Sequence, residues 1–480
     1  MRSYRTHLFA AIVIPLTLQF SAFAQENIAP HVEELPQRIN FNPALSPNNV
    51  GYFTLAGLGG VNISAENTGF CFDDLFTRGT DDTLRLDLGR LAKNMKKTNF
   101  TSVNIDVPIL SFGVRINKGL GYLSFGIDNK TMIESKFDRN ITSLWKGNWN
   151  YDTDEPVNHH ISKIFVRAMN YLEFSGGYSS KLPDINIEIG GRVKFLMGTF
   201  AVLSDDVTLD IQTEEQDPGR YSVAMQTSGS IKTSIPVTTK LDADGYVDKI
   251  TMDDFTLSDI KPSQNKGVAF DLGVTWMPTE DFKLGLSAID IGFIKWHNDC
   301  QQFNASASYT FRGVDFNEDM KTGINTDEEV ENDDSYWSQL KDSLLRVKDI
   351  TLSWTSFKTR LSSRLIATAD FRATKWLSLG ATVATKFVDK QAFTRSSVSA
   401  LLHAGSWLTF AGTAAINPGF RFSPGVGIFI TGGPVQFYVL ADRFPHNLST
   451  STGTSVSTGI NFVIKKSKLE NREENNPKFR

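Results

Sequence analysis

The chain has 480 residues, with 53 acidic and 49 basic side chains, a formal net charge of −4 and 35 phenylalanines. A weakly acidic chain gives no electrostatic reason to expect nucleic-acid binding. No stretch beyond residue 24 approaches the 18 or more consecutive apolar residues of a membrane-spanning helix, which excludes a helical membrane protein.

The first 24 residues have the pattern of a secretory signal peptide. Arg2 and Arg5 precede an apolar run from Leu8 to Phe20, and Ala22-Phe23-Ala24 presents the small residues that signal peptidase recognises. We expect cleavage before Gln25, which changes the formal net charge from −4 to −6 because the two arginines are the only ionised side chains removed. No cysteine follows the cleavage point, so no lipid anchor is expected there. An exported chain without a spanning helix is either soluble or a β-barrel.

Residues 25–49 contain four prolines and are predicted to form an irregular periplasmic lead-in. A glycine-rich strand at 52–65 follows, and Leu86, Leu91 and Met95 indicate a short amphipathic helix at about 84–97. The next strands are predicted at 101–116 and 119–129, joined by a tight turn.

The clearest strand pattern lies between Lys266 and Ala288. From 268 to 276 every second residue is apolar, and after a turn at 277–281 the alternation resumes with Phe282. One face is apolar, the other is small or polar, and Trp276 and Phe282 flank the turn, as in a transmembrane β-hairpin. A hairpin of a soluble β-sandwich buries one face in the same way, so this segment alone does not decide between the two.

The remaining strands are predicted at 171–182, 185–203, 365–372, 377–386, 398–403, 408–416, 422–430, 435–441 and 453–464. Two insertions interrupt them. Residues 205–265 have strand-like pieces of their own, and residues 296–362 contain an acidic stretch at 315–334 and a predicted helix at 336–347. Residues 466–480 are a charged tail that we expect to be disordered.

Short turns near residues 117, 183, 277, 374, 405 and 432 alternate with longer connections. This alternation is typical of outer-membrane barrels with tight periplasmic turns and long extracellular loops. We therefore predict an all-β fold, a closed antiparallel transmembrane β-barrel of about 14 strands over residues 50–465. Counting 303–311 and 350–357 as spanning strands gives 16, with the acidic stretch then periplasmic.

Several segments together resemble known barrel families. Asn40-Phe41-Asn42-Pro43-Ala44-Leu45 resembles the asparagine-proline-alanine segment near the mature N-terminus of long-chain fatty-acid transporter barrels, which have fourteen strands. The order of that segment, the 84–97 region, Leu110-Ser111-Phe112-Gly113-Val114-Arg115 and Trp145-Lys146-Gly147-Asn148 is similar to a family of uncharacterised Gram-negative barrel proteins, a domain of unknown function. This likeness covers most of residues 40–465. It implies outer-membrane placement and a related barrel, but no chemistry, so fatty-acid transport is an analogy only.

Enzyme signatures are missing from the sequence: it has no Gly-x-Ser-x-Gly elbow, no His-Glu-x-x-His motif and no phosphate-binding glycine loop. We expect a non-enzymatic protein without a cofactor. A barrel hydrolase would need a serine and a histidine facing the membrane, and His403 is the histidine that we place beside a spanning strand.

Two polar segments have residues of the kind that bind metal ions. His159 and His160, near Asp152, Asp154 and Glu155, could bind a metal, but a solvated loop explains them better. The segment 315–326 begins like a calcium loop but has methionine where glycine is required, so an acidic surface loop is the simpler interpretation. No metal site is expected.

The two cysteines, Cys71 and Cys300, could form a disulfide in an oxidising compartment, or remain two thiols. In a surface loop, Trp145, Trp149 and Tyr151 could contact a ligand, or serve as interface anchors or packing residues.

Charged residues that alternate with predicted lipid-facing positions should point into the lumen. They would line a polar channel or, more in keeping with a narrow barrel, pair in a structural network. These candidates are Glu188, Arg192, Lys194, Asp271, Lys283, Asp370 and Arg372.

The first functional hypothesis is a barrel in outer-membrane lipid that binds or passes a small apolar molecule, which predicts an apolar pocket in the loops with an opening through the wall or lumen. The alternative is a membrane anchor whose insertions contact an envelope, surface or secretion component. It predicts a sealed lumen and an exposed apolar patch on an insertion. No ligand-binding residue can be assigned from the sequence.

Overall fold

The computed structural model describes residues 26–55, 57–78, 83–116, 121–150, 153–182, 185–217, 220–241, 243, 247–251, 264–311, 350–417, 421–443 and 453–464. The signal peptide, the acidic stretch with its predicted helix, the calcium-like segment and the charged tail therefore lie outside the described residues. No helix among the described residues is long and apolar enough to cross a membrane.

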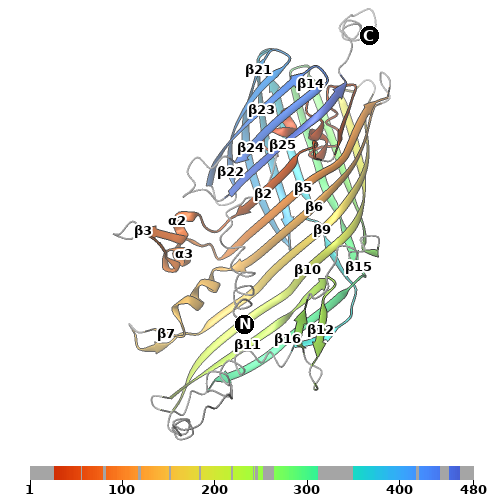
Figure 1. The fold of residues 1–480 in the computed structure, drawn as a ribbon. Helices are drawn as coiled ribbons and strands as arrows, with labels where there is room; N and C mark the ends of the chain where they lie inside the picture. Colours follow the sequence, from red (N-terminus) through yellow and green to blue (C-terminus); the bar gives the residue numbers. More distant parts are fainter. Residues whose placement is uncertain are drawn as a thin grey trace, which may run out of the picture.

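Nineteen strand segments form one antiparallel sheet that closes on itself (Figure 1). They are β1 (Gly51–Leu55), β2 (Val61–Asn67), β5 (Thr98–Arg115), β6 (Tyr122–Asp138), β9 (His159–Lys181), β10 (Ile187–Asp217), β11 (Arg220–Ser234), β14 (Lys266–Thr279), β15 (Phe282–Trp296), β16 (Cys300–Phe311), β17 (Ile350–Ser353), β18 (Phe357–Arg360), β19 (Arg364–Arg372), β20 (Leu377–Val388), β21 (Gln391–Ala404), β22 (Leu408–Asn417), β23 (Arg421–Gly432), β24 (Val435–Arg443) and β25 (Gly453–Ile464). The ring closes where β25 pairs with β1 and β2.

The sequence predicts about 14 strands or, alternatively, 16, and both numbers describe a part of this barrel. β1 and β2 are one interrupted strand, as are β17, β18 and β19, so the nineteen segments make sixteen strands. Two of the sixteen, β11 and β16, join the sheet only beyond the β14–β15 hairpin, so fourteen strands encircle the end of the barrel that carries the tight turns. The sequence suggested 303–311 and 350–357 as the two additional strands. The first corresponds to β16, but the other additional strand is β11, from the first insertion. Residues 350–353 instead begin the strand that continues into β19.

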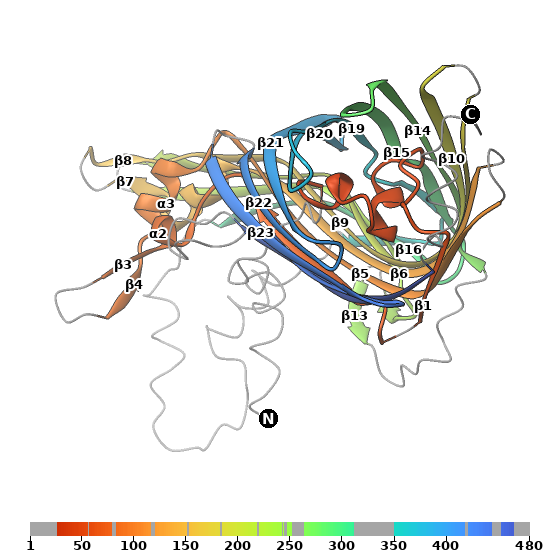
Figure 2. The same cartoon turned by 90° about the horizontal axis from the view of Figure 1, so that it is seen from above.

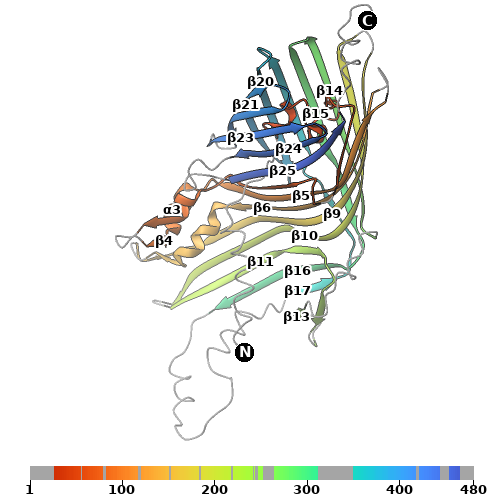
Figure 3. The same ribbon diagram turned by 45° about the horizontal axis from the view of Figure 1, so that its top comes forward.

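The barrel branches along β10, which is 31 residues long. Its first part, Ile187–Met197, pairs with β14, and its second part, Ala201–Asp217, pairs with β11. At about 3.3 Å per residue such a strand spans roughly 100 Å, far more than the ~30 Å hydrocarbon core of a bilayer. Figure 3 shows β6, β9, β10, β11 and β16 continuing well past the ends of β20 to β25. The first insertion is thus largely a continuation of the barrel wall.

The predicted hairpin forms as expected and its apolar face points outward. Leu272 is 59% exposed and Asp271, the next residue along β14, is 0% exposed. Other strands of the wall alternate in the same way, so large apolar side chains cover the outside while small and polar ones face the lumen. This arrangement is the reverse of a soluble protein and matches a lipid-facing wall.

Smaller elements surround the far ends of β5, β6 and β9. The predicted helix at 84–97 is present but shorter, as α3 (Leu88–Asn94), and it begins where Asp87 Oδ1 accepts a hydrogen bond from Arg90 N at 2.8 Å. It lies near α2 (Phe72–Leu75), the hairpin of β3 (Phe76–Arg78) and β4 (Leu84–Leu86), the 3-10 helix η3 (Arg139–Lys146), and the pair β7 (Trp149–Asn150) and β8 (Glu155–Pro156). A separate hairpin, β12 (Thr238–Leu241) and β13 (Val247–Thr251), belongs to the first insertion.

One expectation has to be corrected. Residues 26–49 were predicted to be a periplasmic lead-in, but in the structure they lie inside the barrel, where most of their side chains are buried (Figure 2). The prolines did exclude long helices and strands, and the segment contains only two 3-10 helices, η1 (Ala29–His31) and η2 (Pro36–Asn40). A wide barrel has space to fill, and an irregular segment with apolar side chains on several sides can fill it.

Candidate functional site

The N-terminal segment, residues 26–49, is the plug of the barrel and forms the floor of the candidate site. Its apolar side chains, among them Val32, Leu35 and Phe41, pack against inward-facing residues of the wall such as Leu401 and Leu440 in one buried cluster. Burial of that cluster favours a plug that stays in place.

Glycines in the wall make room for the plug. Gly190 of β10 and Gly273 of β14 are paired across neighbouring strands. A Cβ atom at Gly190 would lie 2.4 Å from the Pro43 carbonyl carbon, and one at Gly273 would lie 2.0 Å from Asn42 Oδ1. The asparagine-proline-alanine segment, Asn42 to Ala44, therefore passes directly over bare backbone, which explains why the wall has glycine at both positions.

Polar contacts from several strands hold the plug. His31 Nδ1 lies 2.5 Å from Asp370 Oδ1 of β19, and Arg192 Nη1 of β10 donates to Asn40 Oδ1 at 2.5 Å. On β15, Ser287 Oγ donates to the Phe41 carbonyl at 2.5 Å. These bonds fix the register of the plug against the wall.

At the turn end, Glu33 of the plug meets two cations of the wall. Lys283 Nζ lies 3.3 Å from Glu33 Oε1, and Arg372 Nη2 lies 3.0 Å from Glu33 Oε2. Burial acts to raise the pKa of this carboxyl, but the positive charges of Lys283 and Arg38 in particular lower the pKa of Glu33 from 4.5 to about 2. Glu33 is therefore ionised at neutral pH. It lines a cavity of about 320 Å³ that also contains His403.

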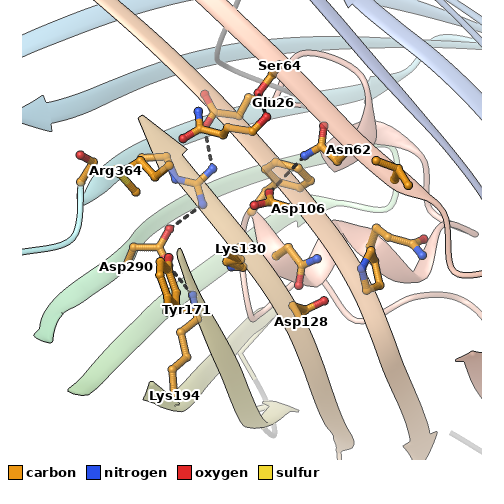
Figure 4. Close-up of a pocket in the computed structure, with 18 of the residues that line it drawn as sticks. Glu26, Asn62, Ser64, Asp106, Asp128, Lys130, Tyr171, Lys194, Asp290 and Arg364 are labelled. Carbon is orange, nitrogen blue, oxygen red and sulfur yellow. Dashed lines mark hydrogen bonds and ion pairs between the residues drawn. The ribbon is translucent and has the colours of Figure 1, made fainter. Parts of the chain in front are cut away.

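Above the plug lies a second cavity of about 120 Å³, shown in Figure 4. Charged side chains line it from β5, β6, β10, β15, β19, β20 and the plug: Glu26, Asp106, Asp128, Lys130, Arg192, Lys194, Asp290, Arg364 and Lys386. Volume and lining suit a few water molecules or a small solute with polar groups.

The cations of this cavity are shared among carboxylates. Lys194 Nζ lies 2.8 Å from Asp271 Oδ2 and 2.5 Å from Asp290 Oδ1. Arg364 joins the wall to the plug, with Nη2 at 2.8 Å from Asp290 Oδ2 and Nη1 at 2.8 Å from Glu26 Oε1. Each ion pair is buried or nearly so, which makes the set a coupled network.

Backbone geometry helps to build this network. Asp290 has a φ of 60°, an uncommon value for a residue other than glycine, and sits where the pairing of β14 and β15 shifts register. Its amide donates to Asp271 Oδ1 at 2.8 Å. The bulge thus aims the Asp290 carboxylate at Lys194 and Arg364.

Two carboxylates on the opposite side are less engaged. Asp106 of β5 accepts a hydrogen bond from Asn62 Nδ2 at 3.3 Å. Asp128 of β6 makes no hydrogen bond or ion pair within the described part of the chain, and Lys130, two residues along the same strand, pairs with Glu173 at 3.0 Å. This wall of the cavity therefore offers acceptor oxygens to a bound molecule.

The structure brings most of the lumen candidates into contact with the plug or with one another. Arg192, Lys194 and Asp271 belong to the buried network, Asp370 contacts the plug through His31, and Lys283 and Arg372 contact it through Glu33. Glu188 lies apart from them, half-buried near the start of β10.

Other candidates are not brought to the lumen. Cys71 and Cys300 form no disulfide and are buried at separate places in the fold. His159 Nε2 lies 2.8 Å from the Gly147 carbonyl oxygen, and His160 pairs with Asp210, so neither joins a metal cluster among the described residues. Trp149 packs edge-on against Tyr221, with ring centroids 4.6 Å apart.

His403, considered for a hydrolase, does lie beside a serine. Its Nε2 is 3.2 Å from Ser378 Oγ, but its Nδ1 is 3.0 Å from Thr409 Oγ1 and not beside a carboxylate. The pair lines the turn-end cavity.

Several site residues were not found by sequence reasoning. Those of the plug, Glu26, His31 and Glu33, were assigned to a periplasmic lead-in. Lys130 was placed in a loop because the predicted strand ended at residue 129, whereas β6 continues to Asp138. The polar alternation of residues 124–136 could have shown that continuation, since inward positions of a barrel strand are polar even beyond the lipid.

These features define a class of protein: a closed antiparallel β-barrel with an apolar outer face, a lumen plugged by its own N-terminal segment and a charged internal cavity. The chain belongs to the family described as "Family of unknown function (DUF5723)", whose model matches residues 43–442.

Solved structures of low similarity include three barrels. The Pseudomonas putida toluene transporter TodX is 8% identical, with 93% of this chain and 98% of that chain covered and a TM-score of 0.38. The Ralstonia pickettii toluene transporter TbuX is 10% identical, with 91% and 96% covered and a TM-score of 0.39. A Pseudomonas aeruginosa FadL homologue is 11% identical, with 92% and 97% covered and a TM-score of 0.37. At this level the likeness says nothing about the ligand of this chain. No curated protein matches the sequence significantly.

Proposed function

We propose that this chain is a non-enzymatic outer-membrane barrel that binds or passes a small molecule, with residues 26–49 as the plug that controls its lumen. The supporting observation is that a separate stretch of chain, and not wall side chains alone, fills part of the lumen. A ring of this strand number is wide enough to leave an aqueous path when it is not filled. Displacing the plug would therefore open a route through the lumen.

Outer-membrane placement is part of the proposal. It is supported by the signal peptide expected at residues 1–24 and by the band of exposed apolar side chains on the outer face, such as Phe195, Leu272 and Phe410. In water such a surface would cause aggregation, whereas in a bilayer its apolar side chains are solvated by lipid.

An apolar hollow on the outer face of the barrel supports an apolar cargo. One apolar hollow of about 530 Å³ is lined by Ile189, Leu272 and Leu286, and glycine backbone at Gly190 and Gly273 separates it from the plug. We place an apolar cargo there, at the lipid side of a thin wall. The internal cavity, lined by charges, suits a polar solute or the polar end of an amphiphile.

Planar-bilayer recordings test the proposal. The wild-type barrel should conduct poorly, and a variant lacking residues 26–49 should show large, long-lived openings. A milder variant, Gly190→Ala, keeps every plug residue and should give shorter openings if the deletion does not fold. A folded variant with a loosened plug and no added conductance would contradict a channel.

The second candidate is a membrane anchor for another envelope or surface component. It is favoured by the length of β10 and by exposed apolar side chains in the first insertion, including Ile231, Leu241 and Ile250. A photo-reactive residue at position 250 should then crosslink a protein partner in intact cells, and one at the exposed turn residue Lys375 should not. No adduct at position 250 would count against the anchor.

A further inference from the structure

A small lobe projects sideways from the wall beyond the end of β2. This side lobe comprises α2, β3, β4, α3 and η3, and Figures 1 and 2 show α2, α3 and β3 standing away from the barrel. Phe70, Leu75, Leu91 and Met95 form a buried cluster of its own, and Phe137 of β6 packs against that cluster. The side lobe is therefore a packed extension of the wall.

The fully exposed charges of the side lobe are positive. Among its side chains that the structure describes, the acidic ones are buried or half-buried, whereas six basic ones are exposed: Arg85, Arg90, Lys93, Lys96, Lys97 and Arg139. The whole chain, in contrast, has a formal net charge of −4. Such a local excess of cations attracts an anionic partner.

The carboxylates of the side lobe serve its internal structure. Asp74 Oδ1 accepts a hydrogen bond from Asn94 Nδ2 at 2.6 Å, which joins α2 to α3. Asp87 and Asp138 accept hydrogen bonds from backbone amides at the starts of α3 and η3. These three acidic side chains are thus directed at the lobe itself, while the basic ones face outward.

The same elements expose large apolar side chains. Leu86, which directly follows Arg85 in β4, is 53% exposed. Ile141 and Leu144 of η3 are each 37% exposed. A surface that combines cations with exposed apolar side chains is typical of segments that lie on anionic membranes.

The side lobe begins close to the edge of the apolar band on the wall. Ile63 of β2 is 44% exposed, and Asn67, where β2 ends, lies four residues further on. At about 3.3 Å per residue and a strand tilt of about 40°, this separation is roughly 10 Å along the membrane normal. The headgroup layer on each side of a bilayer is about 5–8 Å thick. A lobe that projects sideways at this height therefore lies at the lipid surface.

We propose that the side lobe binds the anionic headgroups of the lipids that surround the barrel, in the leaflet on its side of the membrane. This inference rests on the proposed outer-membrane placement. The basic side chains bind lipid phosphates, and Leu86, Ile141 and Leu144 enter the interface between headgroups and acyl chains. Because Phe137 joins the lobe to β6, this contact also fixes the depth of the barrel in the bilayer.

A fluorescent probe on the lobe tests the proposal. Leu86→Cys is labelled with an environment-sensitive dye, which is selective because Cys71 and Cys300 are buried. The barrel is then placed in nanodiscs of phosphatidylcholine, or of phosphatidylcholine and phosphatidylglycerol in equal parts. We expect a larger blue shift in the anionic discs, and its loss in about 1 M salt, where the Debye length is about 3 Å. The same dye at Leu241→Cys, similarly exposed in β12, is the control and should report water in both discs.

Charge variants test whether the lobe cations cause the shift. Phosphatidylglycerol is titrated into neutral detergent micelles that hold the labelled barrel. Arg90→Gln combined with Lys93→Gln should weaken the apparent affinity about thirtyfold, which corresponds to about 1 kcal/mol for each basic side chain. Lys240→Gln combined with Lys375→Gln removes two exposed cations outside the lobe and should leave the affinity unchanged.

A third probe separates this proposal from outer-membrane placement. The dye at Leu272→Cys, on the outer face of β14, should report lipid in both discs. If it reports water, the placement is wrong and the lobe proposal falls with it. If it reports lipid, three results would overturn the lobe proposal alone: a Leu86 probe equally wet in both discs, equal effects of the two double variants, and an equal response to inorganic phosphate, which would indicate a site for a free anion.

Discussion

The ring of His31 and the carboxylate of Asp370 meet inside the barrel at 2.5 Å, although they are 339 residues apart in the sequence. Asp370 pairs across strands with Gly380, and a Cβ atom at Gly380 would lie 2.5 Å from His31 Cγ. The wall therefore provides both a hydrogen-bond partner and an empty space for one side chain of the plug. The same combination recurs at Asn42, whose Nδ2 donates to the Val274 carbonyl at 3.3 Å and whose Oδ1 lies over Gly273, so plug and wall are complementary in shape.

The contact between Pro43 and the wall is sensitive to a single methyl group. Gly190→Ala places a Cβ atom 2.4 Å from the Pro43 carbonyl carbon, so backbone must move. We expect a loss of about 1–3 kcal/mol in stability, as for other overpacked interiors. This loss is measured by thermal unfolding in detergent: samples are heated to a series of temperatures, and the folded fraction is read from gel mobility without boiling. Gly412→Ala, where no atom lies within 4 Å, is the matched control and should leave the midpoint unchanged.

Lys194 should be the most costly cation of the lumen to remove. It is 2% exposed and compensates both Asp271 and Asp290. Lys194→Met leaves two buried carboxylates without their main partner, and breaking such a buried pair costs about 3–5 kcal/mol. Denaturant unfolding in detergent gives the difference. Lys375→Met, at an exposed turn, serves as the control, and equal effects of the two substitutions would contradict a buried network.

The closure of the plug at its turn end should weaken in acid. The pKa of Glu33 is lowered to about 2, so its ion pairs contribute stability above its unfolded pKa of 4.5 and lose it as the pH falls towards 2. Bilayer recordings should show more openings at about pH 2.5 than at about pH 5. In Glu33→Gln, openings should already be frequent at neutral pH and change less over the same range. An identical pH dependence in the two proteins would rule Glu33 out as the source.

The lipid-facing band can be mapped with charge. Leu272→Arg, on the outer face of β14, should impair folding into lipid vesicles by about 2–4 kcal/mol, the cost of a charge near the bilayer midplane. Leu241→Arg has a similarly exposed position, but it lies in the β12–β13 hairpin of the first insertion and should be tolerated. If both variants fold equally well, the outer face of β14 is not in lipid.

The barrel wall could be predicted from the amino-acid sequence. Alternation of apolar and polar residues, interrupted by tight turns, leaves few other structures for segments such as 266–288, because the period of two sets which side chains face lipid and which face the lumen. The same alternation puts Arg192, Lys194 and Asp271 on the inward face, and all three side chains are buried. The predicted strands at 119–129 and 185–203 ended too early, because β6 and β10 continue beyond the length that crossing a bilayer requires.

What fills the lumen became known from the folded chain alone. The plug has no periodicity, since each of its residues is matched to a different part of the wall, and nothing local to residues 26–49 reveals that Gly190, Gly273 and Gly380 leave space for it. Which charges pair was equally hidden, because Arg364, Asp290 and Glu26 meet only after the ring has closed. Closure brings distant strands together, and the chemistry of this lumen follows from that long-range geometry.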